Sequence, residues 1–204
     1  MSDPRPARTV ASGALAVLLV LWAGCRDRQP VEPPVLSTLP PFTLIDQRSN
    51  PYGSSDLQGK VWIANFIFTR CPDMCPMLSA AMAKLQQDLT REPLWDRVRL
   101  VSFSVEPDHD SPAVLLDYAE KLGAGSHWAF LTGSREEIWQ LSQEGFKLPT
   151  AESPPDAGNP ILHSNKFVLS DAEGRIRGYY DAREQRDRQR LLRDLRALLG
   201  PAAA

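Results

Sequence analysis

Apolar residues fall into short continuous runs and into stretches with a period near 3.6 residues. The run at residues 60–68, KVWIANFIF, is almost uninterrupted and predicts a strand buried on both faces of a parallel sheet. The residues Asp171–Gly174 separate two later runs and predict the turn of a hairpin. In all, strands are predicted at residues 42–46, 60–68, 99–105, 128–131, 166–169 and 176–180.

Helical patterns alternate with these strands. An apolar residue recurs at every fourth position as far as Leu89 and predicts a first helix. Ser111 as N-cap opens a second helix over residues 112–122, with a proline at its first position. A capping box predicts a helix over residues 134–144, and a leucine stripe predicts a last one over residues 191–199. The alternation predicts an α/β domain with a mixed central sheet flanked by helices.

The N-terminal region has the pattern of an export signal. Arg5 and Arg8 precede an uncharged, apolar stretch at residues 9–25, which is short for a permanent membrane span. The stretch ends in LWAGC and resembles the bacterial lipoprotein signal, in which the cysteine, here Cys25, receives the lipid. Trp22 departs from that pattern, which usually has leucine there, and an uncleaved signal anchor is the alternative.

These features divide the chain into three segments. Residues 1–25 are the predicted signal or anchor, and the proline-rich residues 26–41 are a predicted semi-rigid tether. Residues 42–200 are the predicted single domain. We therefore expect a membrane-anchored domain in a bacterial cell envelope, facing the periplasm or the exterior. The formal net charge of −2 gives no reason to expect a nucleic-acid partner.

The cysteines carry the candidate chemistry. If Cys25 is lipidated, Cys71 and Cys75 remain as a pair, placed where a buried strand turns into a helix. In an exported protein a free dithiol implies a reductant or a metal. Three residues separate the two cysteines, where redox enzymes mostly have two. The wider loop can still close a disulfide, and it also allows both sulfurs to converge on one soft metal ion.

A third ligand could come from one of the three histidines, His109, His127 or His163. His163 follows a polar loop at residues 152–160, a position from which a ligand can move toward an ion and away from it. Pro76 is predicted to be the first residue of the helix and Cys75 its N-cap, which favours a thiolate.

Three motifs in order resemble the SCO1/SenC family. They are the dithiol segment FTRCPDMCP at residues 68–76, the segment SVEPDHDSP at residues 104–112, and His163 ahead of a strand and hairpin. Residues 176–181 also resemble the family's closing Tyr-Tyr stretch. The similarity extends from about Phe42 to Leu199.

This resemblance implies a thioredoxin-like fold in which Cys71, Cys75 and His163 bind copper, as Cu(I) or Cu(II). It implies a metallochaperone that assists assembly of the copper site of cytochrome c oxidase, with the oxidase copper subunit or another envelope copper protein as partner. Two positions depart from the family. Leu162 stands where an acidic residue is common, and Arg70 stands where histidine is common.

Other functions remain open on the sequence. A thiol–disulfide oxidoreductase that keeps a partner's copper-ligating cysteines reduced needs only Cys71 and Cys75. A peroxiredoxin-type peroxidase is disfavoured because residues 66–69 lack the expected setting of the attacking cysteine. A closed zinc site needs a fourth ligand that is not identifiable, and a structural disulfide is the plainest alternative.

Several nearby residues have ordinary explanations. His109 lies in an acidic turn that we expect to be solvated, and His127 begins a strand. Met74 and Met77 are soft donors but are expected to fill a loop and a helix core. Asp73 could cap the helix or steer a partner. The arginines of the last helix form a solvated face, with attraction to anionic lipid as the alternative; they are Arg183, Arg186, Arg188, Arg190, Arg193 and Arg196.

Overall fold

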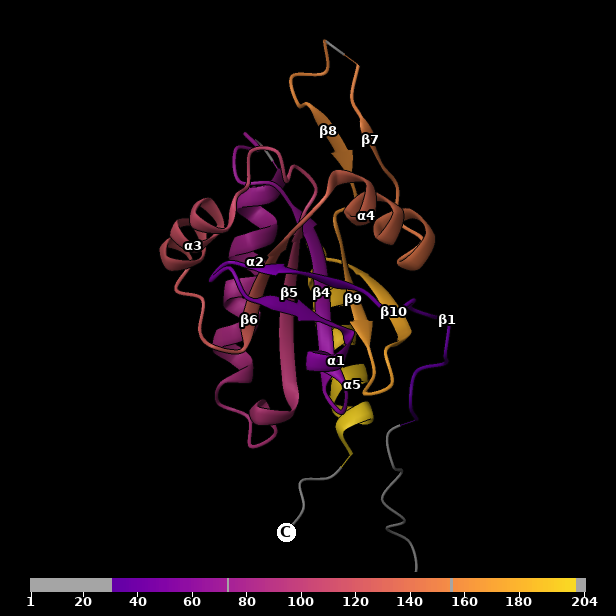
Figure 1. The fold of residues 1–204 in the computed structure, drawn as a ribbon. Coiled ribbons are helices and arrows are strands. Elements are labelled where there is room, and N and C mark those ends of the chain that lie inside the picture. The colour runs from indigo at the N-terminus through magenta and orange to yellow at the C-terminus, as the bar shows by residue number, and fades with distance from the viewer. Residues whose placement is uncertain (1–30, 73, 155, 201–204) are drawn as a thin grey trace, which may run out of the picture. The chain divides into compact units, whose positions relative to one another are not determined.

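An eight-stranded mixed sheet runs through the domain (Figure 1), with the strand order β1-β10-β9-β4-β5-β6-β2-β3. The computed structural model describes residues 31–72, 74–154 and 156–200. The predicted signal at residues 1–25 with Cys25, the start of the predicted tether and Asp73 lie outside the described residues.

The centre of the sheet is parallel and its margins are antiparallel. The strands β4 (Val61–Ile67), β5 (Val98–Ser104) and β6 (Trp128–Thr132) run in the same direction. All seven residues of β4 are buried, which confirms the prediction of a strand covered on both faces. The other strands of this sheet are β1 (Ser37–Thr38), β2 (Thr43–Asp46), β3 (Pro51–Gly53), β9 (Lys166–Ser170) and β10 (Arg175–Asp181).

Helices pack against this sheet, as the sequence predicts. The helix α2 contacts β4, α3 contacts β6, and α5 contacts both β10 and β4. Ser111 caps α3 by accepting a hydrogen bond from the Val114 amide, with Pro112 at the first helical position. The helices are α1 (Ser54–Leu57), α2 (Met74–Leu89), α3 (Pro112–Lys121), α4 (Arg135–Gln140) and α5 (Gln185–Leu199), with a 3-10 turn at Trp95–Arg97 and a π-helical turn at Leu141–Gly145. Of the helices that the structure describes, none has the length and apolar character that a bilayer span requires.

A second, two-stranded sheet was not predicted. The strands β7 (Thr150–Glu152) and β8 (Ile161–His163) pair as an antiparallel hairpin around the polar segment expected to be a loop. In Figure 1 this hairpin projects from the end of the main sheet at which α2 begins. The sequence signal is weak because prolines and polar residues dominate the segment.

The described part of the predicted tether lies against the domain. The strand β1 pairs with β10, and the buried Arg177 of β10 donates a hydrogen bond to the Pro33 carbonyl at 2.8 Å. Arg177 also forms ion pairs with Asp171 at 2.8 Å and with Glu32 at 3.0 Å. The segment from Glu32 is therefore fixed along the sheet edge by a buried cation.

We expect the substitution Arg177→Met to destabilise the domain by about 2–4 kcal/mol, because it leaves the buried Asp171 carboxylate with fewer cationic partners. The matched control is Lys121→Met, which removes an exposed i,i+4 pair with Asp117 and should cost less than about 1 kcal/mol. Urea unfolding of the reduced protein measures both, and equal losses would contradict the role given to Arg177.

Candidate metal centre

The two cysteines lie where β4 passes into α2. Cys71 follows the end of β4, and α2 begins at Met74, so Cys75 is the second residue of the helix. The expectation that Cys75 is the N-cap and Pro76 the first helical residue is wrong. Pro76 is the third residue of α2, two positions deeper than expected, and a proline fits there because amides in the first helical turn have no partner within the helix.

The thiols and one histidine converge. The Cys75 Sγ lies 3.1 Å from the His163 Nε2, and the Cys71 Sγ accepts a hydrogen bond from the Cys75 amide at 3.4 Å. The two sulfurs and one nitrogen all lie within 4.8 Å of one another. Cys71 is 5% exposed, Cys75 0% and His163 8%. Two soft sulfurs and an imidazole form a donor set that suits copper.

His163 is held in an orientation that a ligand needs. Its Nδ1 lies 3.1 Å from the Ser164 carbonyl, which can only accept, so Nδ1 carries the proton of the neutral ring. The lone pair of Nε2 then faces Cys75. The ring also packs edge-to-face against Phe68, with 5.5 Å between centroids. In the chain, His163 is the last residue of the strand β8 and is not part of an irregular loop.

Two buried carboxylates fix the dithiol loop from the side of β5. Asp110 is 0% exposed and accepts hydrogen bonds from the Thr69 amide at 3.0 Å, the Thr69 hydroxyl at 2.6 Å and the Ser104 hydroxyl at 2.6 Å. Glu106, which is 3% exposed, pairs with Arg70 through the guanidinium Nε at 2.9 Å. The expectation of a solvated acidic turn at residues 106–110 is therefore wrong for these two residues, because their partners lie in the distant dithiol loop.

The remaining candidates lie apart from the three donors. The His109 Nδ1 lies 3.0 Å from a carboxylate oxygen of Asp110, and the two residues form a cluster with Glu106. The carboxylates of this cluster are hydrogen-bonded to the dithiol loop. His127 stacks on Trp95 at the start of β6, with 4.7 Å between ring centroids. Met77 is 46% exposed on α2 and so does not fill the helix core as expected.

Burial controls the chemistry of the metal-free Cys75. Loss of hydration raises the pKa of its thiol well above the ordinary value. The predicted lowering of the pKa by the helix N-terminus is therefore wrong, since desolvation by burial is the largest influence on this thiol. The thiol faces the His163 Nε2 at 3.1 Å, and binding of a metal has to displace its proton.

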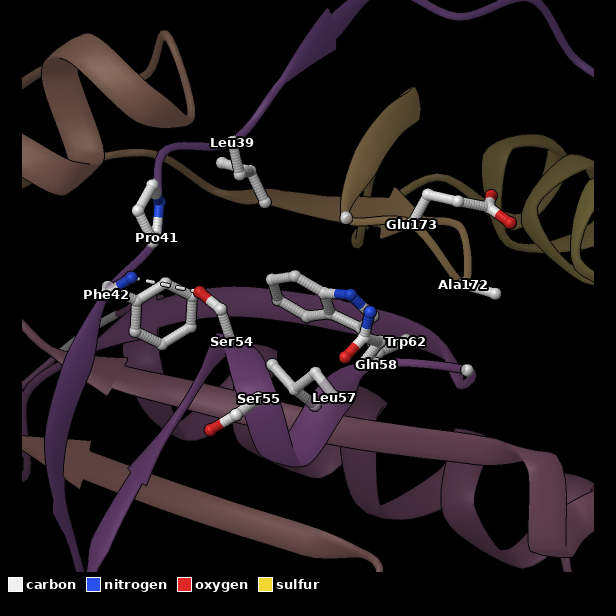
Figure 2. Close-up of a pocket in the computed structure, with 12 residues that line it drawn as sticks. Leu39, Pro41, Phe42, Ser54, Ser55, Leu57, Gln58, Trp62, Ala172 and Glu173 are labelled. Atoms are coloured by element: carbon white, nitrogen blue, oxygen red, sulfur yellow. Dashed lines mark hydrogen bonds between the residues drawn. The ribbon is translucent and has the colours of Figure 1, made fainter.

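One pocket is remote from these residues. It measures about 560 Å³, lies at the opposite end of β4 and is lined by apolar side chains such as Phe42 and Trp62 and by polar ones such as Ser54 and Gln58 (Figure 2). Its lining contains neither cysteine nor histidine. A second pocket of about 510 Å³ lies between Arg70, Glu106 and the β7–β8 hairpin, next to the dithiol loop.

A model of the SCO1/SenC family matches residues 32–200. The chain belongs to this family. It is 30% identical to the SCO1 protein homologue of Bacillus subtilis over 190 residues, which covers 92% of this chain and 96% of the relative.

Solved structures of the family have the same fold. A SCO1/SenC family lipoprotein from Bacillus anthracis shares 35% identity and a TM-score of 0.73, over 84% of this chain and 98% of that one. BsSco, described as a Sco family cytochrome c oxidase assembly protein with a disulfide switch, shares 31% identity and a TM-score of 0.71 over the same fractions, 84% and 98%. Yeast Sco1 with copper bound shares 25% identity and a TM-score of 0.60, over 76% and 87%. The predicted thioredoxin-like α/β fold is confirmed.

The Cys75 pKa is testable in the reduced, metal-free Cys71→Ser variant. Because burial raises this pKa, thiolate absorbance should appear only well above the value of about 8.5 at which free cysteine titrates. Burial of the neutral thiol contributes fully to the free energy of unfolding below the free-cysteine pKa of about 8.5. This contribution is lost as the pH rises from there through the folded-state pKa. Thiolate formation near or below neutral pH would contradict the burial.

Proposed function

We propose that this protein is a copper-binding assembly factor of the cell envelope, in which Cys71, Cys75 and His163 hold copper as cargo for a recipient copper protein. The observation that carries the proposal is the convergence of two sulfurs and one imidazole nitrogen within 4.8 Å. We propose the copper subunit of cytochrome c oxidase as recipient, with another envelope copper protein as the broader class.

The residues around the three donors suit the reversible binding of an ion. The Ser164 carbonyl fixes the tautomer of His163, and the buried carboxylates of Asp110 and Glu106 hold the loop that carries Cys71. The surroundings exclude bulk water, which protects a reduced sulfur-bound ion. Three ligands fall short of a closed structural site, so a donor group of a recipient can still approach.

The relatives support the assignment through their described roles. BsSco is described as belonging to a family of cytochrome c oxidase assembly proteins, and the yeast relative is a copper-bound protein. Their likeness covers three quarters or more of this chain.

The copper proposal predicts one bound ion per chain that depends on all three donors. We expect His163→Ala to lower the affinity for Cu(II) by at least about tenfold and to alter the thiolate-to-copper charge-transfer band, because an imidazole ligand is lost. Affinity should rise with pH, since binding displaces the Cys75 proton. Titration of the reduced protein followed by absorbance measures all three effects.

The matched control is His109→Ala, which removes a histidine near the dithiol loop that lies outside the three-donor group. It should bind copper as the unchanged protein does. Copper binding and spectra that survive His163→Ala intact would contradict the proposed three-residue centre.

A second function, thiol–disulfide exchange, is favoured by the closeness of the two sulfurs, which lie within 4.8 Å of each other on residues four positions apart. Such an oxidoreductase would use Cys71 and Cys75 to reduce a disulfide formed by a partner's copper-ligating cysteines, becoming a disulfide itself. Reductase activity that is unaffected by His163→Ala, together with absence of copper binding, would select this function over metal delivery.

We also propose the predicted anchoring, with lipid on Cys25 and the folded domain in the envelope, where the domain begins ahead of the predicted residue 42 because β1 (Ser37–Thr38) belongs to its sheet. The described segment from Glu32 onward is packed on the domain, which leaves a short connection to the membrane. We expect Cys25→Ser to prevent incorporation of labelled fatty acid in bacterial cells, since the acceptor sulfur is removed. Undiminished labelling would contradict lipidation at this residue.

A further inference from the structure

Thr150 lies directly opposite His163 in the β7–β8 hairpin. The two residues are paired across the strands, and both are buried, at 2% and 8% exposure. Side chains of residues paired in this way project from the same face of a sheet, with Cβ atoms about 4.5–5.5 Å apart. Thr150 therefore flanks the imidazole on the side of β7, as Phe68, the residue after β4, does from the main sheet.

The π-helical turn fixes the position of Thr150. The Ser142 hydroxyl, which is fully buried, lies 2.7 Å from the Thr150 hydroxyl and 3.3 Å from the Leu148 carbonyl. Ser142 can donate to the carbonyl while it accepts the proton of Thr150. Gln143, in the same turn, donates to the Thr150 carbonyl. π-helical turns are rare in proteins, and those that occur often lie at functional sites.

We propose that Thr150, held by Ser142, is a positioning residue that sets the distance of the His163 imidazole from the two sulfurs. This inference rests on the proposed copper function. The Ser164 carbonyl fixes the tautomer and Phe68 restricts the ring, but neither determines where the end of β8 lies. The only strand that pairs with β8 among the described residues is β7. Thr150 is the buried attachment of β7 to the body of the domain, whereas the other, an ion pair between Glu152 and Arg135 at 3.4 Å, is exposed.

The test substitutes the hydroxyl without changing the shape of the side chain. Thr150→Val should weaken Cu(II) binding about 10- to 100-fold, the usual effect of losing a group that orients a metal ligand. Its charge-transfer band should shift toward that of His163→Ala. Thr150→Ser keeps the hydroxyl and should restore both properties, which a loss of packing alone would not explain.

A matched control removes a buried hydroxyl elsewhere. Ser102 on β5 is 1% exposed and bonds to Asn65 at 2.7 Å and to Trp128 at 3.0 Å. Ser102→Ala should lower the free energy of unfolding and leave the copper affinity and spectrum unchanged. Urea unfolding and copper titration on the same samples separate stability from ligand position.

The outcomes distinguish the two proposals. Copper affinity and spectrum unchanged in Thr150→Val but altered in His163→Ala would overturn the positioning role alone. Copper binding that is unchanged in His163→Ala would overturn the proposed copper-binding function, on which the positioning role rests. If Thr150→Val does not fold, Ser142→Ala, which removes the other hydroxyl of the pair, decides the positioning role by the same two readouts.

Discussion

The contact between the Cys75 Sγ and the His163 Nε2 joins residues that are 88 positions apart in the sequence. It requires the first turn of α2 and the end of the β7–β8 hairpin to meet at one end of the sheet. Neither element can supply a metal centre alone, since the dithiol loop and the first turn of α2 carry the sulfurs and the hairpin carries the imidazole. The architecture around the site therefore serves to bring a helix and a hairpin together within hydrogen-bond distance.

Three buried polar restraints maintain that meeting, namely Asp110, Glu106 and the Ser142–Thr150 hydroxyl pair. Asp110 and Glu106 attach the dithiol loop to the segment after β5, and the π-helical turn attaches the base of the hairpin. The buried strand β4 supports the dithiol loop as well, because the end of the strand leads into that loop. Each restraint is a buried polar group with hydrogen-bond partners, which gives defined geometry at the cost of desolvation.

Features that depend on local sequence were predictable, and features that depend on distant partners were not. The run KVWIANFIF predicts β4, and Ser111 with Pro112 predicts the start of α3, because periodicity and capping are local. The burial of Asp110 was missed because its partner Thr69 lies 41 positions earlier. The raised pKa of Cys75 was missed because helix position can be inferred from sequence, whereas desolvation depends on the packed structure. Cys71, Cys75 and His163 were identified together only through the family resemblance.

The central claim is that Cys71, Cys75 and His163 bind one copper ion together. X-ray absorption at the copper edge of the loaded protein counts the sulfur and nitrogen neighbours of the metal directly. We predict two sulfur ligands and one imidazole nitrogen, with the imidazole contribution absent in His163→Ala. A spectrum without imidazole in the unchanged protein, or one unaffected by His163→Ala, would contradict the three-residue centre.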